Sequence, residues 1–150
     1  MIRMLKVGDK APTFLLKDGK GNAVKLSNLK GRVLLYFYPR DNTPGCTTEA
    51  CNLRDNFSKL KSIAILGVSM DSEESHKKFS EKFSLPFPLL ADITGDVCRK
   101  YGVYVQKNMY GHKYWGIKRT SFLIKDGKIV NIFDKVEVGN HAQQVLEVLS

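Results

Sequence analysis

The chain has 150 residues, of which 43% are hydrophobic and 26% are charged, as in an ordinary globular protein. This length suits a single domain over residues 1–150, and no apolar run is long enough to span a membrane. No apolar stretch follows the basic residues at the start, so we expect no signal peptide and a cytoplasmic location. The net charge of +9 comes from scattered lysines and arginines without interleaved aromatic residues, which makes nucleic-acid binding the weaker interpretation.

The first half of the chain alternates apolar runs with amphipathic segments. The apolar runs predict buried strands and the amphipathic segments predict helices, which in chain order cover residues 32–38, 46–60, 62–70 and 71–83. Between the first strand and the first helix, residues 39–45 are expected to form a loop, since they contain two prolines and a glycine. Asp71 and Glu74 have the spacing of a capping box, which predicts that the second helix begins there.

The second half of the chain contains shorter predicted elements. After a break at two prolines we expect a strand, a helix and a loop, which cover residues 89–92, 95–101 and 103–116. Asp126 and Gly127 join two apolar runs, which is the pattern of a β-hairpin over residues 120–133. Asn140 opens a final amphipathic helix, with Gln143 in the reciprocal capping position. The whole pattern predicts an α/β (α+β) sandwich, in which a mixed sheet carries helices on its faces.

The chain has three cysteines, an odd number that cannot all pair within one monomer. In a reducing cytosol a disulfide is more often transient and catalytic than structural. The cysteines and histidines show no close-spaced ligand pairs, so we predict no metal site. Cys98 is expected to pack in or near the core, with a resolving or intermolecular role as the alternative. His76 and His141 fall near predicted helix starts, and we interpret them as surface residues.

Cys46 falls in the first turn of a predicted helix, directly after the loop with two prolines and a glycine. Unpaired N–H groups and the positive end of the helix dipole favour an anion there, such as a thiolate. An ordinary thiol with a pKa of about 8.5 is only about 3% ionised at pH 7, and making the thiolate the major form takes roughly 2.7 kcal/mol. One helix dipole supplies at most about 2 kcal/mol, so a second positive group is expected. The helix start alone leaves a buried structural cysteine open, whereas the rigid loop favours a reactive one.

The run from Tyr38 to Cys51, YPRDNTPGCTTEAC, closely resembles the active-site segment of the peroxiredoxins. That family places a Pro, then a Thr or Ser, then the peroxidatic Cys at this spacing, matched here by Pro39, Thr43 and Cys46. A second Cys five residues later is typical of the branch called bacterioferritin comigratory protein or peroxiredoxin Q, and Cys51 matches it.

Two further segments carry the same resemblance. The family has an Arg just before a Thr/Ser-Phe strand, and Arg119 matches it in the run GIKRTSFLI, residues 116–124. The opening run VGDKAPTF, residues 7–14, is similar to the family's N-terminal signature. The order of the predicted elements matches the family along nearly the whole chain.

The resemblance implies a thioredoxin-like fold and a thiol peroxidase that reduces hydrogen peroxide or organic hydroperoxides to water or alcohols. Cys46 would attack the peroxide and become a sulfenic acid, which Cys51 would resolve as an intramolecular disulfide. Thr43 would hydrogen-bond the thiolate and the peroxide, and Pro39 would shield the sulfur from water. Arg119 would supply the second positive charge and polarise the O–O bond. The role of the nearby carboxylate at position 49 stays open between a helix-dipole partner and a site residue.

The five-residue spacing of Cys46 and Cys51 sets a geometric condition on that disulfide. On an intact helix the two residues differ by about 7.5 Å in rise and by roughly 140° in direction. This exceeds the Cα separation of about 7 Å that a disulfide tolerates, so the first turns of the helix must unwind. The spacing also differs from the two-residue gap of disulfide-exchange enzymes.

The expected reductant is thioredoxin, glutaredoxin or a similar dithiol protein, and no metal, haem or flavin motif accompanies the cysteines. We expect a monomer, because a resolving cysteine so close in sequence removes the chemical need for a dimer. Two rival functions remain: a redox sensor or chaperone switched by the same disulfide, and a general thiol–disulfide oxidoreductase. Thr43 and Arg119 favour the peroxidase, because simple disulfide exchange needs neither of them.

Overall fold

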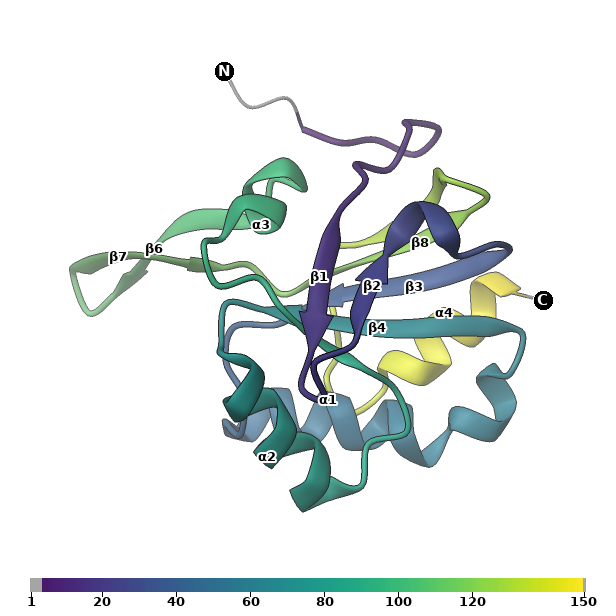
Figure 1. Ribbon diagram of the computed structural model, residues 1–150. Coiled ribbons are helices and arrows are strands. Elements are labelled where there is room, and N and C mark those ends of the chain that lie inside the picture. The colour runs from purple at the N-terminus through teal and green to yellow at the C-terminus, as the bar shows by residue number, and fades with distance from the viewer. Residues whose placement is uncertain (1–3, 150) are drawn as a thin grey trace.

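The computed structural model describes residues 4–149, and a mixed seven-stranded sheet runs through this part of the chain (Figure 1). In sheet order its strands are β2 (Ala23–Lys25), β1 (Leu15–Asp18), β5 (Leu89–Ala91), β4 (Ile63–Ser69), β3 (Arg32–Phe37), β8 (Thr120–Lys125) and β9 (Lys128–Phe133). Strands β3, β4 and β5 are parallel, and the pairs on either side of them are antiparallel. The α/β class with a mixed sheet, including the predicted hairpin of β8 and β9, is therefore confirmed.

The central strand β3 pairs with β4 on one side and with β8 on the other. Its side chains alternate between two cores: Val33, Leu35 and Phe37 pack into one, and Leu34 and Tyr36 into the other. All five are buried. This burial on both faces explains why the strand appears in the sequence as a continuous apolar run rather than an alternating one.

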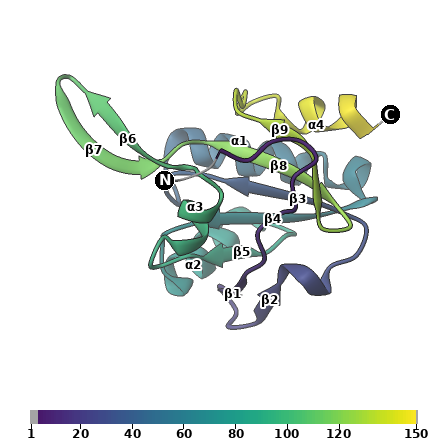
Figure 2. The same ribbon diagram turned by 90° about the horizontal axis from the view of Figure 1, so that it is seen from above.

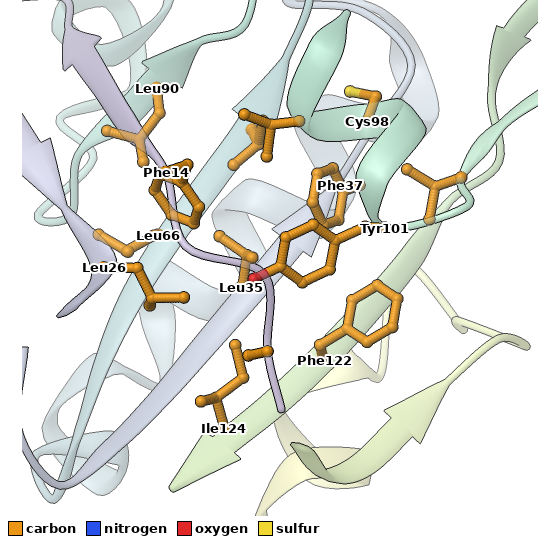
Figure 3. Packing of buried hydrophobic residues seen from close by; sticks show 14 of the residues in the cluster. Phe14, Leu26, Leu35, Phe37, Leu66, Leu90, Cys98, Tyr101, Phe122 and Ile124 are labelled. Atoms are coloured by element: carbon orange, nitrogen blue, oxygen red, sulfur yellow. The ribbon is translucent and has the colours of Figure 1, made fainter. Parts of the chain in front are cut away.

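Helices cover both faces of the sheet (Figures 1 and 2). The helices α1 (Pro44–Asp55), α2 (Glu73–Phe83) and α4 (His141–Leu149) pack on the face of Leu34 and Tyr36, and the short helix α3 (Asp96–Lys100) packs on the other face. On that second face the ring of Tyr101 lies 5.2 Å from Phe37 and 5.1 Å from Phe122, centre to centre (Figure 3). Within residues 4–149, no helix is long and apolar enough to cross a membrane.

The prediction of a loop over residues 103–116 is wrong, because this segment forms a β-hairpin of β6 (Tyr104–Met109) and β7 (His112–Ile117). The two residues between these strands, Tyr110 and Gly111, both have positive φ, as a tight two-residue hairpin turn requires. Most side chains of the hairpin are exposed or half-buried, so its sequence lacks an alternating apolar pattern. In both views the hairpin projects from the body of the molecule (Figures 1 and 2).

Two helix boundaries and two caps also differ from the sequence prediction. Helix α1 begins two residues early and ends at Asp55, and a 3₁₀ turn (Phe57–Leu60) replaces its expected last turn. Ser72 caps α2 in place of Asp71, since its hydroxyl accepts the backbone N–H of Ser75 at 3.1 Å. Gln143 does not cap α4 but donates its amide to the side chain of Asn56 at 3.3 Å.

Candidate active site

Cys46 lies in the first turn of α1, as predicted, where the chain turns back after β3. Tyr38 continues the strand by donating its backbone N–H to the carbonyl of Val68 at 3.1 Å. The loop then reaches Thr43, the N-cap of α1, and Pro44 takes the first helical position, which its fixed φ suits. The side chain of Cys46 is only 2% exposed. A cysteine this enclosed is accessible to a small reagent more readily than to a disulfide held in another protein.

Arg119 stands in the short link between β7 and β8 and directs its guanidinium group at the start of α1. Its Nη2 lies 3.4 Å from the sulfur of Cys46, and its Nη1 lies 2.6 Å from Oε1 of Glu49. Only 22% of the arginine side chain is exposed, so water screens its charge weakly. The helix dipole alone is too weak to make the thiolate the major form, so a second positive group is needed. Arg119 is such a group, and it contacts the sulfur.

Gly45 leaves the space that Arg119 occupies. A Cβ atom at this position would lie 3.1 Å from Nη2 of the arginine, closer than an ordinary van der Waals contact. A residue with a Cβ atom would therefore displace the guanidinium group by a few tenths of an ångström. The close approach of the arginine, rather than an unusual backbone conformation, explains why glycine suits the second position of this helix.

Thr43 and Pro39 lie at the two ends of the loop. Thr43 does not form the expected hydrogen bond with the sulfur of Cys46. The hydroxyl of Thr43 instead donates to the carbonyl of Arg40 at 2.9 Å, which closes the loop on itself. Pro39 is half-buried directly after β3. Both residues thus shape the backbone that leads into α1.

Glu49 is fully buried one turn after Cys46 and forms an ion pair with Arg119. Burial raises the pKa of its carboxyl group to about 7, although the arginine acts in the opposite direction. Near neutral pH this group therefore exists in both protonation states. The sequence left its role open, and the structure places it inside the site rather than on the helix surface.

Three more polar side chains lie behind Glu49, each from a different element. Nε2 of His141, at the start of α4, lies 3.9 Å from Oε2 of Glu49 and 2.8 Å from the hydroxyl of Ser121 on β8. Tyr36 on β3 is buried nearby, and burial together with the Glu49 carboxylate raises its pKa well above 10. The prediction that His141 is a surface residue is wrong, because the start of α4 packs its ring against Phe133.

Asp41 fastens the loop before α1 to the rest of the molecule. Its carboxylate accepts the hydroxyls of Tyr38 and Ser75 at 2.5 and 2.8 Å and faces Nδ1 of His76 at 2.7 Å. The other ring nitrogen of His76 lies 2.9 Å from the carbonyl of Leu90, so the ring joins the loop to β5. His76 too was predicted at the surface and is fully buried, since it lies on the face of α2 that packs against the sheet.

Asp41, Asp71 and His76 together bring three possible metal-ligating atoms within 4.8 Å of one another. Each of these groups already has partners from the protein: Asp71, for example, accepts the backbone N–H of Asp41 and the hydroxyl of Ser69. These hydrogen bonds account for the cluster as a structural support of the loop.

The other two cysteines differ sharply in their surroundings. Cys51 is half-buried on α1, five residues after Cys46, and both thiols are free. Cys98 is fully buried in the core on the opposite face of the sheet, as predicted. Burial and the carboxylate of Asp92 raise the pKa of the Cys98 thiol, which keeps it in the unreactive protonated form.

Comparison with known proteins identifies the family. Residues 7–132 match the model of the AhpC/TSA family. Peroxiredoxin Bcp of Escherichia coli is 48% identical over 149 residues, which cover 97% of this chain and 96% of the relative. The chain belongs to the AhpC/TSA family. Peroxiredoxin Bcp of Bacillus subtilis is 45% identical over 150 residues, covering 97% of this chain and 95% of that protein.

Within the AhpC/TSA family, the likeness extends to three-dimensional structure. The bacterioferritin comigratory protein of Xanthomonas campestris superposes with a TM-score of 0.85 at 39% identity, covering 91% of this chain and 89% of that one. The chain is accordingly a peroxiredoxin of the Bcp branch with a thioredoxin-like fold, and its activity is that of a thiol-dependent peroxidase.

Proposed function

We propose that the thiolate of Cys46 reduces hydrogen peroxide and organic hydroperoxides to water and alcohols. The contact of the Arg119 guanidinium group with the sulfur is the observation that supports this role most directly. The Xanthomonas campestris relative has alkyl peroxide reduction activity, which favours organic hydroperoxides as substrates of this chain. Antioxidant defence and redox homeostasis are the corresponding cellular functions.

In the proposed first step, the Cys46 thiolate attacks the terminal peroxide oxygen, and the O–O bond breaks. The sulfur becomes a sulfenic acid, and the leaving oxygen departs as hydroxide or alkoxide and takes up a proton. Arg119 stabilises the charge that moves from the sulfur to the leaving oxygen. The backbone N–H groups of Gly45 and Cys46 help to bind the peroxide. The Thr43 hydroxyl turns from the carbonyl of its own loop toward the substrate.

In the second step, the Cys51 thiolate attacks the Cys46 sulfur and forms an intramolecular disulfide. The S–O bond breaks, and the hydroxide leaves as water after taking up the proton that the Cys51 thiol had lost. Both residues belong to the intact helix α1, so this step requires the first turns of that helix to unwind. A thioredoxin, a glutaredoxin or a similar dithiol protein then reduces the disulfide, and the helix forms again. The unwound segment gives that protein the access that the buried sulfur of the folded state denies it.

This cycle needs only one chain, so we propose a monomer that acts in the cytoplasm. Two cysteines of the same helix perform both chemical steps, with Pro39 and Thr43 shaping the loop around them. The cysteine sulfur is the redox centre, and no step calls for a metal, haem or flavin.

The test adds one equivalent of hydrogen peroxide to the reduced protein and follows peroxide loss and intact mass. We expect rapid consumption, the loss of two hydrogens and a Cys46–Cys51 peptide after digestion. Cys46→Ser should abolish the reaction, Cys51→Ser should keep one fast oxidation but lose turnover with a dithiol reductant, and Cys98→Ser serves as the matched control. A reaction as slow as that of a free thiol would refute the proposal. Fast oxidation without turnover by any dithiol protein would instead indicate a redox sensor.

A further inference from the structure

Behind the Arg119–Glu49 ion pair lies a buried pair of titratable groups that the proposed cycle does not use. Oε1 of Glu49 binds Arg119, while its Oε2 has no hydrogen-bond partner within residues 4–149. Nε2 of His141 lies 3.9 Å from this oxygen, and both side chains are fully buried. An unpartnered carboxylate oxygen next to a histidine nitrogen, away from water, needs a physical explanation.

The hydrogen bonds of His141 define which of its nitrogens carries the hydrogen. Gln144 donates its amide N–H to the carbonyl of Lys135 and accepts the backbone N–H of Glu137 with its oxygen, both at 3.1 Å. That same oxygen faces Nδ1 of His141 at 2.9 Å, so Nδ1 must donate the hydrogen. Nε2 of the neutral ring is then an acceptor, and the hydroxyl of Ser121 donates to it.

Nε2 of a neutral His141 therefore offers no hydrogen to the free oxygen of Glu49. Two acceptor atoms 3.9 Å apart in a buried space repel each other, and a proton on the carboxyl group relieves this repulsion. Burial raises the pKa of the Glu49 carboxyl and lowers the pKa of the His141 ring, so the carboxyl is the group that carries this proton.

Charge balance connects this proton to the reactive sulfur. With a Cys46 thiol, the positive charge of Arg119 is balanced by ionised Glu49. With a Cys46 thiolate, the same arginine faces two anions, unless one of them is protonated. Because both cysteine and glutamate are buried, an uncompensated extra anion is costly.

We propose that His141 is a positioning residue that favours the protonated form of Glu49 and thereby allows Cys46 to ionise beside Arg119. This inference rests on the proposed role of Cys46 and deepens it. In the balanced step, the proton of the Cys46 thiol moves to the Glu49 carboxylate, which gives a thiolate and a carboxylic acid that no longer repels Nε2 of His141. After the thiolate has attacked the peroxide, the release of that proton balances the one taken up by the leaving alkoxide.

Other titratable groups near Glu49 and His141 lie on several neighbouring elements. Tyr36 stays neutral because its pKa is raised well above 10. The pKa of Lys107 on β6 is lowered by partial burial and by Arg119. The remaining neighbours are the site residues of α1, α4 and the link between β7 and β8, namely Cys46, Glu49, His141 and Arg119.

The first test removes the acceptor with His141→Phe and restores one with His141→Gln. Without the acceptor Glu49 holds its proton less well, so we expect the ultraviolet titration of the thiolate to move to higher pH. The rate of peroxide reduction at neutral pH should fall about tenfold, equivalent to one pKa unit, and recover at higher pH. His141→Gln should restore most of both. His112→Gln, which changes an exposed histidine of the hairpin, should change neither.

If His141 only packs the start of α4, both variants would lose stability while the titration and the pH profile of the rate stay in place, and the proposal would be overturned. A second measurement does not depend on how these variants fold. Infrared spectra of the reduced wild-type protein at neutral pH should show a protonated-carboxyl band that is absent from Glu49→Gln and from Cys46→Ser. The same band in Cys46→Ser would show that Glu49 and Cys46 do not share a proton, and would also overturn the proposal.

These measurements are made before any peroxide is added. If the proposed peroxidase cycle is wrong, peroxide is consumed slowly. If Glu49 does not take the proton of Cys46, the thiolate titration stays the same in the His141 variants and the carboxyl band stays the same in Cys46→Ser. The two outcomes are therefore distinguishable.

Discussion

At the scale of single residues, the site depends on the planar shape of one guanidinium group. Arg119 contacts the sulfur of Cys46 with one nitrogen and the carboxylate of Glu49 with the other. A lysine ammonium group is a single point charge and cannot hold both contacts in one fixed geometry. With an arginine at this position, the Glu49 carboxylate can hold the guanidinium group in place beside the Cys46 sulfur.

We predict that Arg119→Lys slows the oxidation of Cys46 by peroxide about 100-fold, the usual effect of losing one oriented donor in a reacting site. The measurement is the second-order rate constant of the first oxidation, followed in a single turnover. Arg99→Lys is the control, since that arginine is exposed and pairs with Asp96 on α3. A loss of less than about threefold in Arg119→Lys would contradict the bridging role.

The raised pKa of Glu49 also predicts how the free energy of unfolding depends on pH. Its carboxyl pKa is about 7 in the folded protein and 4.5 in its ordinary state, so the folded protein binds more protons between these values. Its contribution is fully present below pH 4.5 and is lost as the pH rises through 7, amounting to about 3 kcal/mol at most. His141 acts oppositely, because its lowered pKa makes the folded protein bind fewer protons just below pH 6.5.

Chemical denaturation from pH 4.5 to 8 measures this effect as the difference between the wild-type protein and Glu49→Gln. The free energy of unfolding of the wild type should fall relative to the variant as the pH rises. A difference that stays constant with pH would show that Glu49 has an ordinary pKa.

Several residues of the site were predictable from the sequence, and others were not. Cys46 and Arg119 stand in runs whose pattern is local, so spacing and resemblance were sufficient to single them out. Glu49 and His141 are 92 positions apart in numbering, and only the packing of α4 against α1 brings them together. His141 stands at a helix start, where a polar residue is ordinarily exposed, and nothing local in the sequence indicated its burial.

At the scale of elements, helix α1 consists of two parts that behave differently. The part up to Cys51 carries both cysteines, and Asn52 attaches the remaining part to α4. The Asn52 side chain donates to the carbonyl of Gly139 at 3.2 Å and accepts the backbone N–H of Ala142 at 2.7 Å. Because Asn52 directly follows Cys51, the unwinding that the disulfide requires should stop there.

We predict that oxidation removes the hydrogen-exchange protection of residues 46–51 and leaves that of residues 53–55. Asn52→Ala should weaken the attachment by about 2 kcal/mol and let the loss of protection spread to the end of α1. Asn108→Ala, in the exposed hairpin, is the control. Equal protection of residues 46–51 in both redox states would contradict local unwinding.

The elements themselves differ in how well the sequence predicted them. Strand β3 is buried on both faces and appears as a plain apolar run. Hairpin β6–β7 leaves most side chains exposed on both faces, and the turn at Tyr110 and Gly111 lacks the Asn-Gly or Asp-Gly pair that usually indicates a hairpin. Its two strands pair through the backbone along their full length but carry few buried side chains, which leaves no alternating apolar pattern to detect.

At the scale of the whole molecule, one buried network joins the active-site loop to the sheet. Asp41 belongs to the loop, His76 to α2, and the carbonyl of Leu90 to β5. The side chains of His76 and Asp41 are 0% and 3% exposed, so neither has water to replace a lost partner. The network therefore couples the shape of the loop to the packing of a helix and a strand far away in sequence.

We predict that His76→Gln lowers the free energy of unfolding by about 3 kcal/mol, because it takes one of three partners from the buried Asp41 carboxylate and the partner of the Leu90 carbonyl. Denaturant unfolding at neutral pH measures the change, with Lys77→Gln as the exposed neighbouring control. A change below about 1 kcal/mol would mean that water reaches the aspartate and replaces the ring.

The overall class of the fold was predictable because alternating apolar and amphipathic segments determine a mixed sheet with covering helices. The order of the strands was not, since it depends on contacts between distant segments, such as β1 with β5 and β3 with β8. The buried histidines belong to the same category. Each completes a contact that exists only after the whole chain has folded.

The attachment of α1 to α4 by Asn52 has a consequence for survival under strong oxidative stress. In the proposed cycle, the sulfenic acid at Cys46 waits until its helix opens, and a second peroxide that arrives first converts it to a sulfinic acid that a dithiol cannot restore. Every bond that holds the helix closed lengthens this wait. Because Asn52 keeps the rest of α1 folded, only the hydrogen bonds of residues 46–51 must break, and we expect their strength to set the peroxide concentration at which the protein begins to inactivate itself.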